Sequence, residues 1–349
     1  MKFFTSPQDT WDHMYQDIAA AKKSILFEQF IFEDFENDEV GERFANLFIQ
    51  KAHEGVQVRL LLDIFGSHRL FFSPTKKTLR DAGVQIHFTA IYLKHFLTFS
   101  FWKTRRNHRK LTIIDDTTAY IGGVVFTENV STWYDFHARI HSPSQIFTHT
   151  FFLSKKTKDA GRLLRDTALE DEPYNVVTND FKNHHISQGI YEKIISSEKS
   201  ITIITPYFAP PERFVNALLS ASERGVSVQI IFPENTDNYF ALSTHYYYIY
   251  RLRNSNIEFK AFTKMNHSKV IMIDNWITFG SCNFDYLSLK YNKELNITTS
   301  DTQLIKEIGE ILTPIIKETI PVAESHILNS AMIFKMKRIF IGSFARFFV

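Results

Sequence analysis

Two stretches of this chain carry the same three chemically active residues at the same spacing. They are His108, Lys110 and Asp115, and then His267, Lys269 and Asp274. In an extended strand a spacing of two places side chains on one face, so the His and Lys of each copy should point the same way. Imidazole is a nucleophile and proton carrier near neutral pH, and an ammonium group holds phosphoryl oxygens. The pattern therefore suits the cleavage of phosphodiesters.

A carboxylate follows the His at the same offset in both copies, at Asp135 and at Glu294. This match suggests a partner for each imidazole. A carboxylate that accepts the ring N–H fixes the tautomer and leaves the other nitrogen able to attack. Two such sets suggest a single site at a pseudo-two-fold interface, where one His attacks phosphorus and the other protonates the leaving alkoxide.

Each copy runs on into a glycine-containing turn, Gly122-Gly123 in the first and Gly280-Ser281 in the second. Hydroxyl, amide and backbone groups near these turns, with the two Lys, can hold phosphoryl oxygens where charge builds. This set accounts for phosphodiester cleavage without a metal, and no dense cluster of Asp, Glu and His at ligand spacing argues for one. A single His-x-Lys is often a surface accident, but two copies with matching offsets are hard to obtain by chance.

The segments before the two motifs repeat as well. Periodicity predicts a helix over residues 8–22, then strands and helices in alternation over 24–32, 39–53, 56–63, 74–82 and 84–88. In the second half, 199–204, 224–229 and 257–259 match three of these strands. This internal duplication predicts two similar α/β domains, each with helices packed on a sheet.

We expect a first domain at residues 1–155, a polar linker at 156–182, a second domain at 183–325 and a tail at 326–349. The tail is basic and amphipathic, which is typical of a helix on an anionic bilayer surface, although it could instead dock on the core. Residues 91–103 mix aromatic and basic side chains, which suits a membrane interface or a buried segment covering the sheet.

Composition narrows the class of protein. A chain of 349 residues has room for two domains, and its net charge of +2 does not argue for a nucleic-acid partner. The single cysteine, Cys282, excludes an internal disulfide.

No apolar run approaches the roughly 18 residues of a membrane span, and the N-terminus does not have the pattern of a signal peptide. We expect a peripheral protein on the cytoplasmic side of the bacterial inner membrane.

The duplicated pattern resembles the phospholipase D superfamily, whose signature is His-x-Lys-x4-Asp followed by Gly-Gly or Gly-Ser. Further segments are similar to the bacterial cardiolipin synthase branch, namely 30–34, 55–63, 66–67, 107–110, 133–137, 206–208 and 280–285. The resemblance covers nearly all of residues 5–300. It implies two phospholipase D-type α/β domains, each with a mixed sheet flanked by helices, related by a pseudo-two-fold with the active site at their interface.

The resemblance also implies transfer of a phosphatidyl group from phosphatidylglycerol to a second phospholipid, through a phosphohistidine and with release of glycerol. By this analogy His108 is the nucleophile and His267 the acid/base, although the motifs are too symmetric to prove that order. Asp135 and Glu294 would orient the two His, and Asp115 would stabilise the strand and turn. The groups implied to hold phosphate are Lys110, Lys269, Asn283, Ser281, Gly122, Gly123 and Gly280, and Asp274 would play the part of Asp115 in the second copy.

Two departures from the family pattern stand out. Val125 occupies the position where the family has Asn after the Gly-Gly, and the usual N-terminal transmembrane pair is absent.

Alternative functions are a phospholipase D that hydrolyses lipid, a nuclease of the same superfamily, and a non-enzymatic membrane-organising protein. The near-neutral charge and Phe-rich segments count against the nuclease. We expect phospholipid substrates and an anionic membrane surface as partners, with no cofactor, nucleic acid or protein partner.

Overall fold

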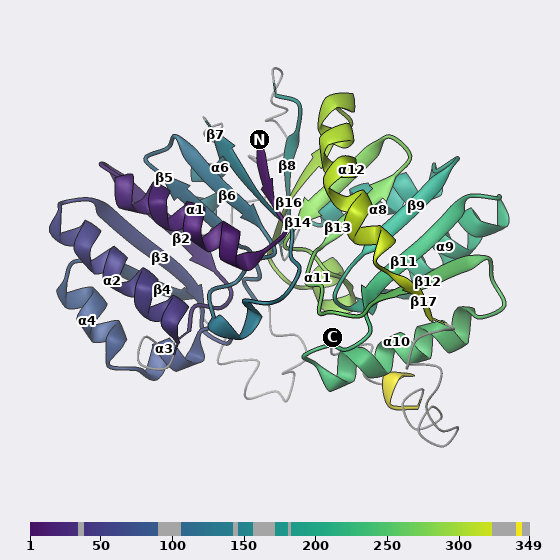
Figure 1. The fold of residues 1–349 in the computed structure, drawn as a ribbon, viewed down its shortest axis with the longest axis horizontal. Coiled ribbons are helices and arrows are strands. Elements are labelled where there is room, and N and C mark those ends of the chain that lie inside the picture. The colour runs from purple at the N-terminus through teal and green to yellow at the C-terminus, as the bar shows by residue number, and fades with distance from the viewer. Residues whose placement is uncertain are drawn as a thin grey trace. The chain divides into compact units, whose positions relative to one another are not determined.

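A computed structural model describes residues 1–33, 38–89, 106–141, 146–155, 172–180, 183–322 and 340–343. The chain divides into two compact units, each built on a sheet of its own (Figure 1). One unit comprises residues 1–169 with Asn292–Leu295, and the other comprises 170–291 with 296–349. The expected repetition of an α/β domain is therefore present.

The first unit contains a seven-stranded mixed sheet in the order β1-β7-β6-β5-β2-β3-β4. The strands β2, β3 and β4 are parallel, whereas β5, β6, β7 and β1 continue the sheet by antiparallel pairing. The elements in chain order are β1 (Lys2–Phe4), α1 (Pro7–Ala20), β2 (Ser24–Gln29), α2 (Glu39–His53), β3 (Gln57–Asp63), α3 (His68–Phe72), α4 (Thr75–Asp81), β4 (Gln85–Thr89), β5 (Leu111–Ile114), β6 (Thr118–Gly122), the 3-10 helix η2 (Glu128–Val130), β7 (His137–His141) and α6 (Ile146–Lys155).

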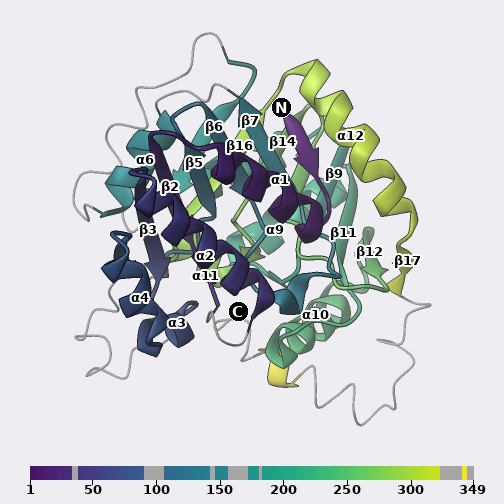
Figure 2. The same ribbon diagram turned by 60° about the vertical axis from the view of Figure 1, so that its left-hand side comes forward.

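Local signals explain where the first helices begin. The Ser6 side chain accepts from the Asp9 N–H, and Pro7 starts α1 with its backbone already suited to a helix. Asp38 caps α2 by accepting from the Gly41 N–H. Helices α1 and α2 lie side by side across one face of the sheet (Figures 1 and 2), where Trp11 and Phe44 are buried in the core.

The second unit contains an eight-stranded sheet in the order β17-β12-β11-β9-β13-β14-β16-β8, and a two-stranded sheet of β10 and β15. Its elements are β8 (Asn175–Asn179), α8 (His185–Ile195), β9 (Ser200–Ile204), β10 (Phe208–Ala209), α9 (Glu212–Glu223), β11 (Ser227–Pro233), α10 (Tyr239–Leu252), β12 (Ile257–Phe262), β13 (Val270–Ile273), β14 (Trp276–Gly280), β15 (Phe284–Asp285), α11 (Tyr286–Lys290), β16 (Glu294–Thr299), α12 (Thr302–Lys317) and β17 (Ile320–Pro321). The first residues of β16 are counted with the first unit.

Apart from the additional edge strand β17, the two main sheets have the same strand order. When β9, β11 and β12 are matched to β2, β3 and β4, then β13, β14, β16 and β8 match β5, β6, β7 and β1 in turn. The duplication therefore extends to β1 and β8, beyond the segments that the sequence match covers. Because β8 (Asn175–Asn179) belongs to the sheet, the expected linker at 156–182 is wrong for these residues.

Other predicted elements need small corrections. The strand expected over 24–32 ends at Gln29, and the short helix α3 was not predicted. Residues 91–103 lie outside the described residues, as does the tail at 326–349 apart from 340–343. These four residues are helical, and a Cβ at Gly342 would lie 2.0 Å from the Ser243 carbonyl oxygen, so this turn packs closely on α10.

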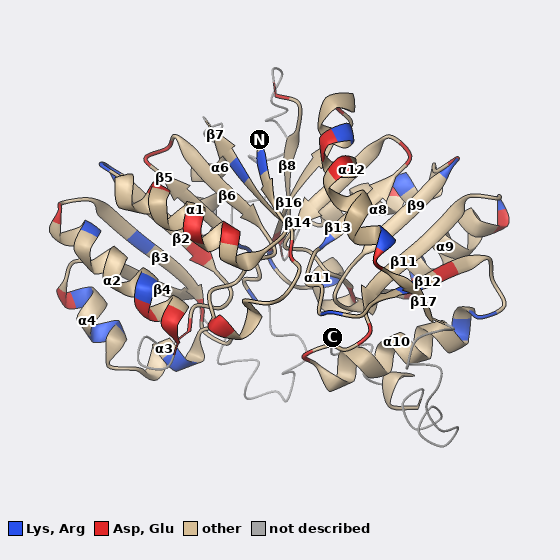
Figure 3. Cartoon of the chain, in the orientation of Figure 1, with Lys and Arg blue, Asp and Glu red and all other residues tan. Residues whose placement is uncertain are grey.

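Charged residues of both signs are interspersed over the helices and loops of each unit (Figure 3). Within the described ranges, no helix has both the length and the apolar composition that crossing a membrane requires.

Candidate active site

His108 and Lys110 lie at the carboxyl end of β2, just before β5 in the first unit. The His108 N–H donates to the Lys293 carbonyl at 3.0 Å, and Lys110 Nζ donates to the His108 carbonyl at 2.8 Å. His108 is 8% exposed and Lys110 is fully buried. The His108 backbone and the Lys110 ammonium group are thus each held by a hydrogen bond in a desolvated place, where charge interactions are strong.

The second copy has the same local geometry. His267 and Lys269 precede β13, and both are buried. The ammonium group of Lys269 donates to the His267 carbonyl, as Lys110 does to His108. The spacing of two therefore produces the same Lys-to-backbone contact in both units.

Glu294 is the carboxylate that contacts His108. Its Oε1 lies 3.0 Å and its Oε2 3.1 Å from Nδ1 of His108, and the Glu294 side chain is fully buried. A carboxylate can only accept, so Nδ1 carries the hydrogen and Nε2 carries the lone pair. Glu294 follows His267 at the shared offset in the sequence, but the imidazole that it contacts is that of His108.

Asp135 is also buried, and Gly123 makes room for it. A Cβ at Gly123 would lie 2.0 Å from Oδ1 of Asp135. The same oxygen accepts from the Phe136 N–H at 2.7 Å, and the Asp135 N–H donates to the Thr5 carbonyl. The glycine of this turn is therefore required because a carboxylate approaches its backbone.

Burial lowers the pKa of Lys110 to about 8, although the negative charges of Glu294, Asp135 and Asp63 act in the opposite direction. Below this pH the side chain is a cation that can hold a phosphoryl oxygen. Above it the empty site loses that cation.

We therefore expect kcat/KM for a phosphodiester substrate to fall about tenfold per pH unit above the pKa of Lys110, because only the protonated form binds phosphate. A pH profile of kcat/KM measures this fall. A Lys110→Arg variant keeps its charge at higher pH, so its profile should lack the part of the fall that deprotonation of Lys110 causes in the wild type. Identical profiles for the two proteins would contradict the assignment.

The motif aspartates hold turns rather than face the His and Lys. Asp115 accepts from the backbone N–H groups of Lys22 at 2.7 Å, Lys23 at 2.7 Å and Ser24 at 2.8 Å. Asp274 accepts in the same way from three N–H groups at 2.9 Å in the second unit. These bonds tie each hairpin to the start of the neighbouring strand, which agrees with the structural role that the resemblance implies.

Asp115→Asn should destabilise the fold by about 1–3 kcal/mol, because an amide turns an N–H donor toward one of the three backbone donors. Burial opposes ionisation of Asp115, but the N–H groups outweigh it and lower the pKa. A carboxyl with a lowered pKa stabilises the fold above its unfolded pKa, so this contribution is lost as the pH falls below about 4. Urea unfolding at pH 7 and pH 3 should therefore show a difference between wild type and variant that shrinks in acid. Asp116→Asn, at the exposed neighbouring position, is the control.

The glycine turns of the two units differ in polarity at the position of Val125 and Asn283. Asn283 is 5% exposed, and its Oδ1 has no hydrogen-bond partner among the described residues. The matching Val125 is buried in the first core, and its carbonyl accepts from Trp11 Nε1 at 3.1 Å. Gly280 adopts a positive φ of 155° and its N–H donates to the Lys269 carbonyl, while Ser281 beside it is fully buried.

Phe30, Asp63 and Asn107 lie near His108, and none of them was assigned a role from the sequence. The Phe30 ring meets the His108 ring edge-on at 4.8 Å and lies 5.4 Å from Lys110 Nζ. The Asp63 carboxylate accepts from the Asn107 N–H at 2.8 Å. All three belong to segments that resemble the cardiolipin synthase branch, so the resemblance marked them without indicating what they contact.

His137, also near the site, is fully buried, and burial lowers its pKa to about 3. Its Nδ1 accepts from the Val124 N–H at 3.4 Å, so the ring is neutral and supports the glycine turn. Within the described ranges, no group of three or more His, Cys, Asp or Glu gathers closely enough to hold a metal ion.

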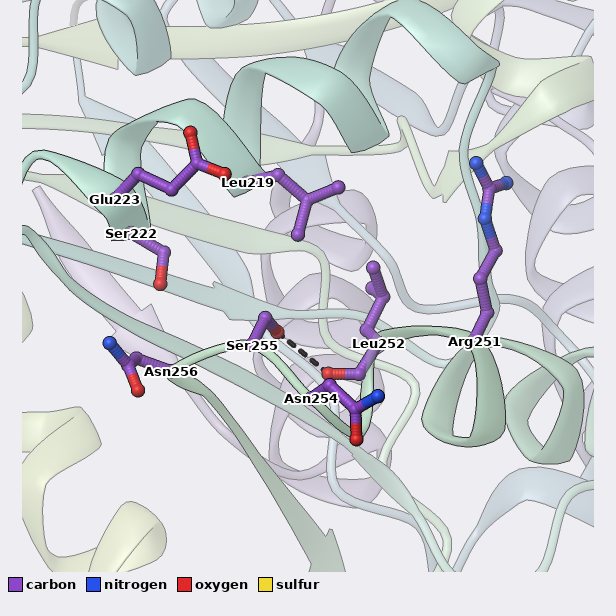
Figure 4. Close-up of a pocket in the computed structure, with 8 residues that line it drawn as sticks. All are labelled: Leu219, Ser222, Glu223, Arg251, Leu252, Asn254, Ser255 and Asn256. Atoms are coloured by element: carbon purple, nitrogen blue, oxygen red, sulfur yellow. Dashed lines mark hydrogen bonds between the residues drawn. The ribbon is translucent and has the colours of Figure 1, made fainter.

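A surface pocket of the second unit is unrelated to these residues (Figure 4). It lies where Glu223 precedes β11 and Asn256 precedes β12, at the amino ends of parallel strands. His267 lies at the opposite edge, because β13 begins beside the carboxyl end of β9. The pocket is lined by Leu219, Ser222, Glu223, Arg251, Leu252, Asn254, Ser255 and Asn256.

Comparison with known proteins agrees with the repeated fold and the paired motifs. A family model described as "Cardiolipin synthase, PLD-like domain" matches residues 14–181 and 190–315. The chain belongs to this family. The expected superfamily, α/β fold class and enzyme class, a phospholipase D-superfamily phosphatidyltransferase, are therefore confirmed.

Relatives within the cardiolipin synthase family align along most of the chain. Cardiolipin synthase A of Pseudomonas syringae pv. syringae is 29% identical, covering 93% of this chain and 71% of the relative. Minor cardiolipin synthase ClsB of Bacillus subtilis is 29% identical, covering 86% and 77%. The cardiolipin synthase of Oceanobacillus iheyensis is 31% identical, covering 87% and 66%. The chain thus spans about two thirds to three quarters of the length of these relatives.

Among solved structures, the chain is similar to phosphatidylserine synthase of Haemophilus influenzae. The TM-score is 0.79 at 14% identity, and the match covers 100% of this chain and 95% of the other. At this identity the likeness supports the fold alone.

Proposed function

We propose that the protein transfers a phosphatidyl group from phosphatidylglycerol to the hydroxyl of a second phospholipid, forming cardiolipin. The observation that carries the proposal is the contact of His108 Nδ1 with Glu294, because it aims the lone pair on Nε2 for attack. The family's cardiolipin synthases support this class of reaction, and the site residues can supply its steps.

In the first step His108 Nε2 attacks phosphorus, and the bond from phosphorus to the oxygen of the headgroup glycerol breaks. His267 gives its proton to the leaving alkoxide, so free glycerol departs and a phosphatidyl-His108 intermediate remains. In the second step His267 takes the proton from the acceptor hydroxyl, whose oxygen attacks phosphorus. The P–N bond then breaks and His108 is restored.

Charge on the phosphoryl oxygens would be held by Lys110 and Lys269, with Asn283 and the turn residues Ser281, Gly122, Gly123 and Gly280 nearby. Glu294 would stabilise His108 when the ring becomes cationic, and Asp135 would do the same for the second imidazole. The proposal requires that both His act on one phosphorus atom.

Incubation with phosphatidylglycerol vesicles tests this function. Cardiolipin and glycerol in equal amounts support it. Phosphatidic acid without cardiolipin would instead identify a hydrolase, and nicking of added DNA with unchanged lipid would identify a nuclease.

We further propose that the protein works as a peripheral enzyme on the cytoplasmic side of the inner membrane and contacts it near α3. Phe72 is 81% exposed and Phe65 is 50% exposed. The guanidinium of Arg106 lies 4.4 Å from the Phe65 ring centre, and Lys76 Nζ lies 4.3 Å from that of Phe71. Exposed aromatic rings beside cations suit an anionic bilayer surface. The same loop begins at Asp63, which bonds to Asn107 next to His108.

A Phe65→Ser/Phe72→Ser variant should bind phosphatidylglycerol vesicles about tenfold more weakly, because two aromatic rings lose their contact with lipid. Co-sedimentation with vesicles measures this. Ile195→Ser removes an apolar side chain of similar exposure, 49%, at the end of helix α8 in the second unit. Its binding should equal that of the wild type, and equal binding by all three proteins would exclude α3 as the contact surface.

A further inference from the structure

Gln29, the last residue of β2, has a fully buried side-chain amide. Its side chain is 0% exposed, and neither Nε2 nor Oε1 has a hydrogen-bond partner among the described residues. Burying an unpaired amide costs free energy, so such a group calls for an explanation, and a bound ligand is one.

The register of the sheet places Gln29 beside Lys110. Strand β2 pairs with β5 through Phe27 and Thr112, then Glu28 and Leu111. Strand β5 begins at Leu111, and extending this register by one residue places Gln29 opposite Lys110. Residues opposite each other project to the same face. Since His108 lies two residues from Lys110, all three side chains share that face.

The second unit shows how the equivalent positions are used. Thr205 occupies the place of Gln29 at the end of β9, where its hydroxyl accepts from the Phe284 N–H at 3.1 Å and donates to the Tyr207 carbonyl at 3.0 Å. There the strand end is structural, and Asn283 in the glycine turn has the unpaired oxygen. In the first unit the turn residue is the apolar Val125, and the unpaired amide is at the strand end.

We propose that Gln29 Nε2 donates a hydrogen bond to a non-bridging oxygen of the phosphoryl group held by Lys110. Gln29 thereby supplies in the first unit the contact that an Asn at position 125 would make. This inference rests on the proposed function for the identity of the substrate, but the anion-binding contact itself does not depend on which phosphodiester reacts.

Gln29→Met tests the role, because methionine has a similar length and no amide. If Gln29 binds phosphate, kcat/KM for phosphatidylglycerol should fall about 10- to 100-fold, as expected for a hydrogen bond to a charged group. The Kd for inorganic phosphate, measured by calorimetry, should rise about tenfold. The urea midpoint should stay the same or rise, since an unpaired buried amide has been removed.

Thr112→Val is the matched control. Thr112 is also fully buried with an unpaired hydroxyl oxygen on the same face, but it lies two residues beyond Lys110, further from His108. This variant should leave phosphate binding and kcat/KM unchanged.

The outcomes separate the two proposals. If the wild type does not transfer phosphatidyl groups but Gln29→Met still weakens phosphate binding, the proposed function fails and the role of Gln29 stands. If Gln29→Met binds phosphate and turns over phosphatidylglycerol like the wild type, the role of Gln29 is refuted. A lower urea midpoint with unchanged binding would make Gln29 a packing residue and also refute it.

Discussion

Replacing His108 by Ala should lower the rate of cardiolipin formation by at least about 10⁴-fold, and replacing His267 should do the same. The first variant lacks the nitrogen that bonds to phosphorus. The second lacks the group that protonates glycerol and activates the acceptor hydroxyl. Because each is proposed as half of one site, neither half should work alone. Quantifying cardiolipin formed from phosphatidylglycerol vesicles measures both effects.

His53→Ala is the control for these variants, since His53 is an exposed residue at the end of α2. Its activity should match the wild type. Mass spectrometry of quenched wild-type enzyme should place the phosphatidyl group on the peptide that contains His108. Its presence on the peptide with His267 would reverse the two roles, and a tenth of the activity surviving in either Ala variant would refute the shared site.

Glu294→Gln should lower kcat by about 10²- to 10⁴-fold with little change in KM. The Glu294 carboxylate accepts from Nδ1 of His108 and would stabilise the cation that forms on attack. An amide can turn its NH₂ group toward Nδ1, which favours the tautomer with the hydrogen on Nε2, where the attacking lone pair is needed. Steady-state kinetics with short-chain phosphatidylglycerol separates kcat from KM.

Asp17→Asn is the matched control, because Asp17 is a carboxylate in an ion pair with Arg139, with contacts of 2.6 and 3.0 Å. It should lower the unfolding midpoint and leave kcat unchanged. If Glu294→Gln behaved in the same way, Glu294 would be a structural residue. A parallel loss in Asp135→Asn would support the same role for the second carboxylate.

The sequence by itself was enough to predict the duplicated motif of this protein and the two similar domains that carry it. Residue spacing within a strand places His108 and Lys110 on one face, and a hairpin turn needs an acceptor such as Asp115 wherever backbone N–H groups converge. These are local effects, so they can be read from neighbouring residues. A duplication then predicts a second domain of the same kind, which the matching strand orders of the two sheets confirm.

The tertiary structure alone decided which distant groups meet. Glu294 follows His267 in the sequence, yet its segment packs with the first unit and its carboxylate reaches His108. Burial likewise depends on the whole fold: it lowers the pKa of Lys110, and it leaves the amide of Gln29 without a partner. Strand spacing repeats every two residues, but desolvation and long-range pairing depend on how remote segments pack, and no local pattern records that.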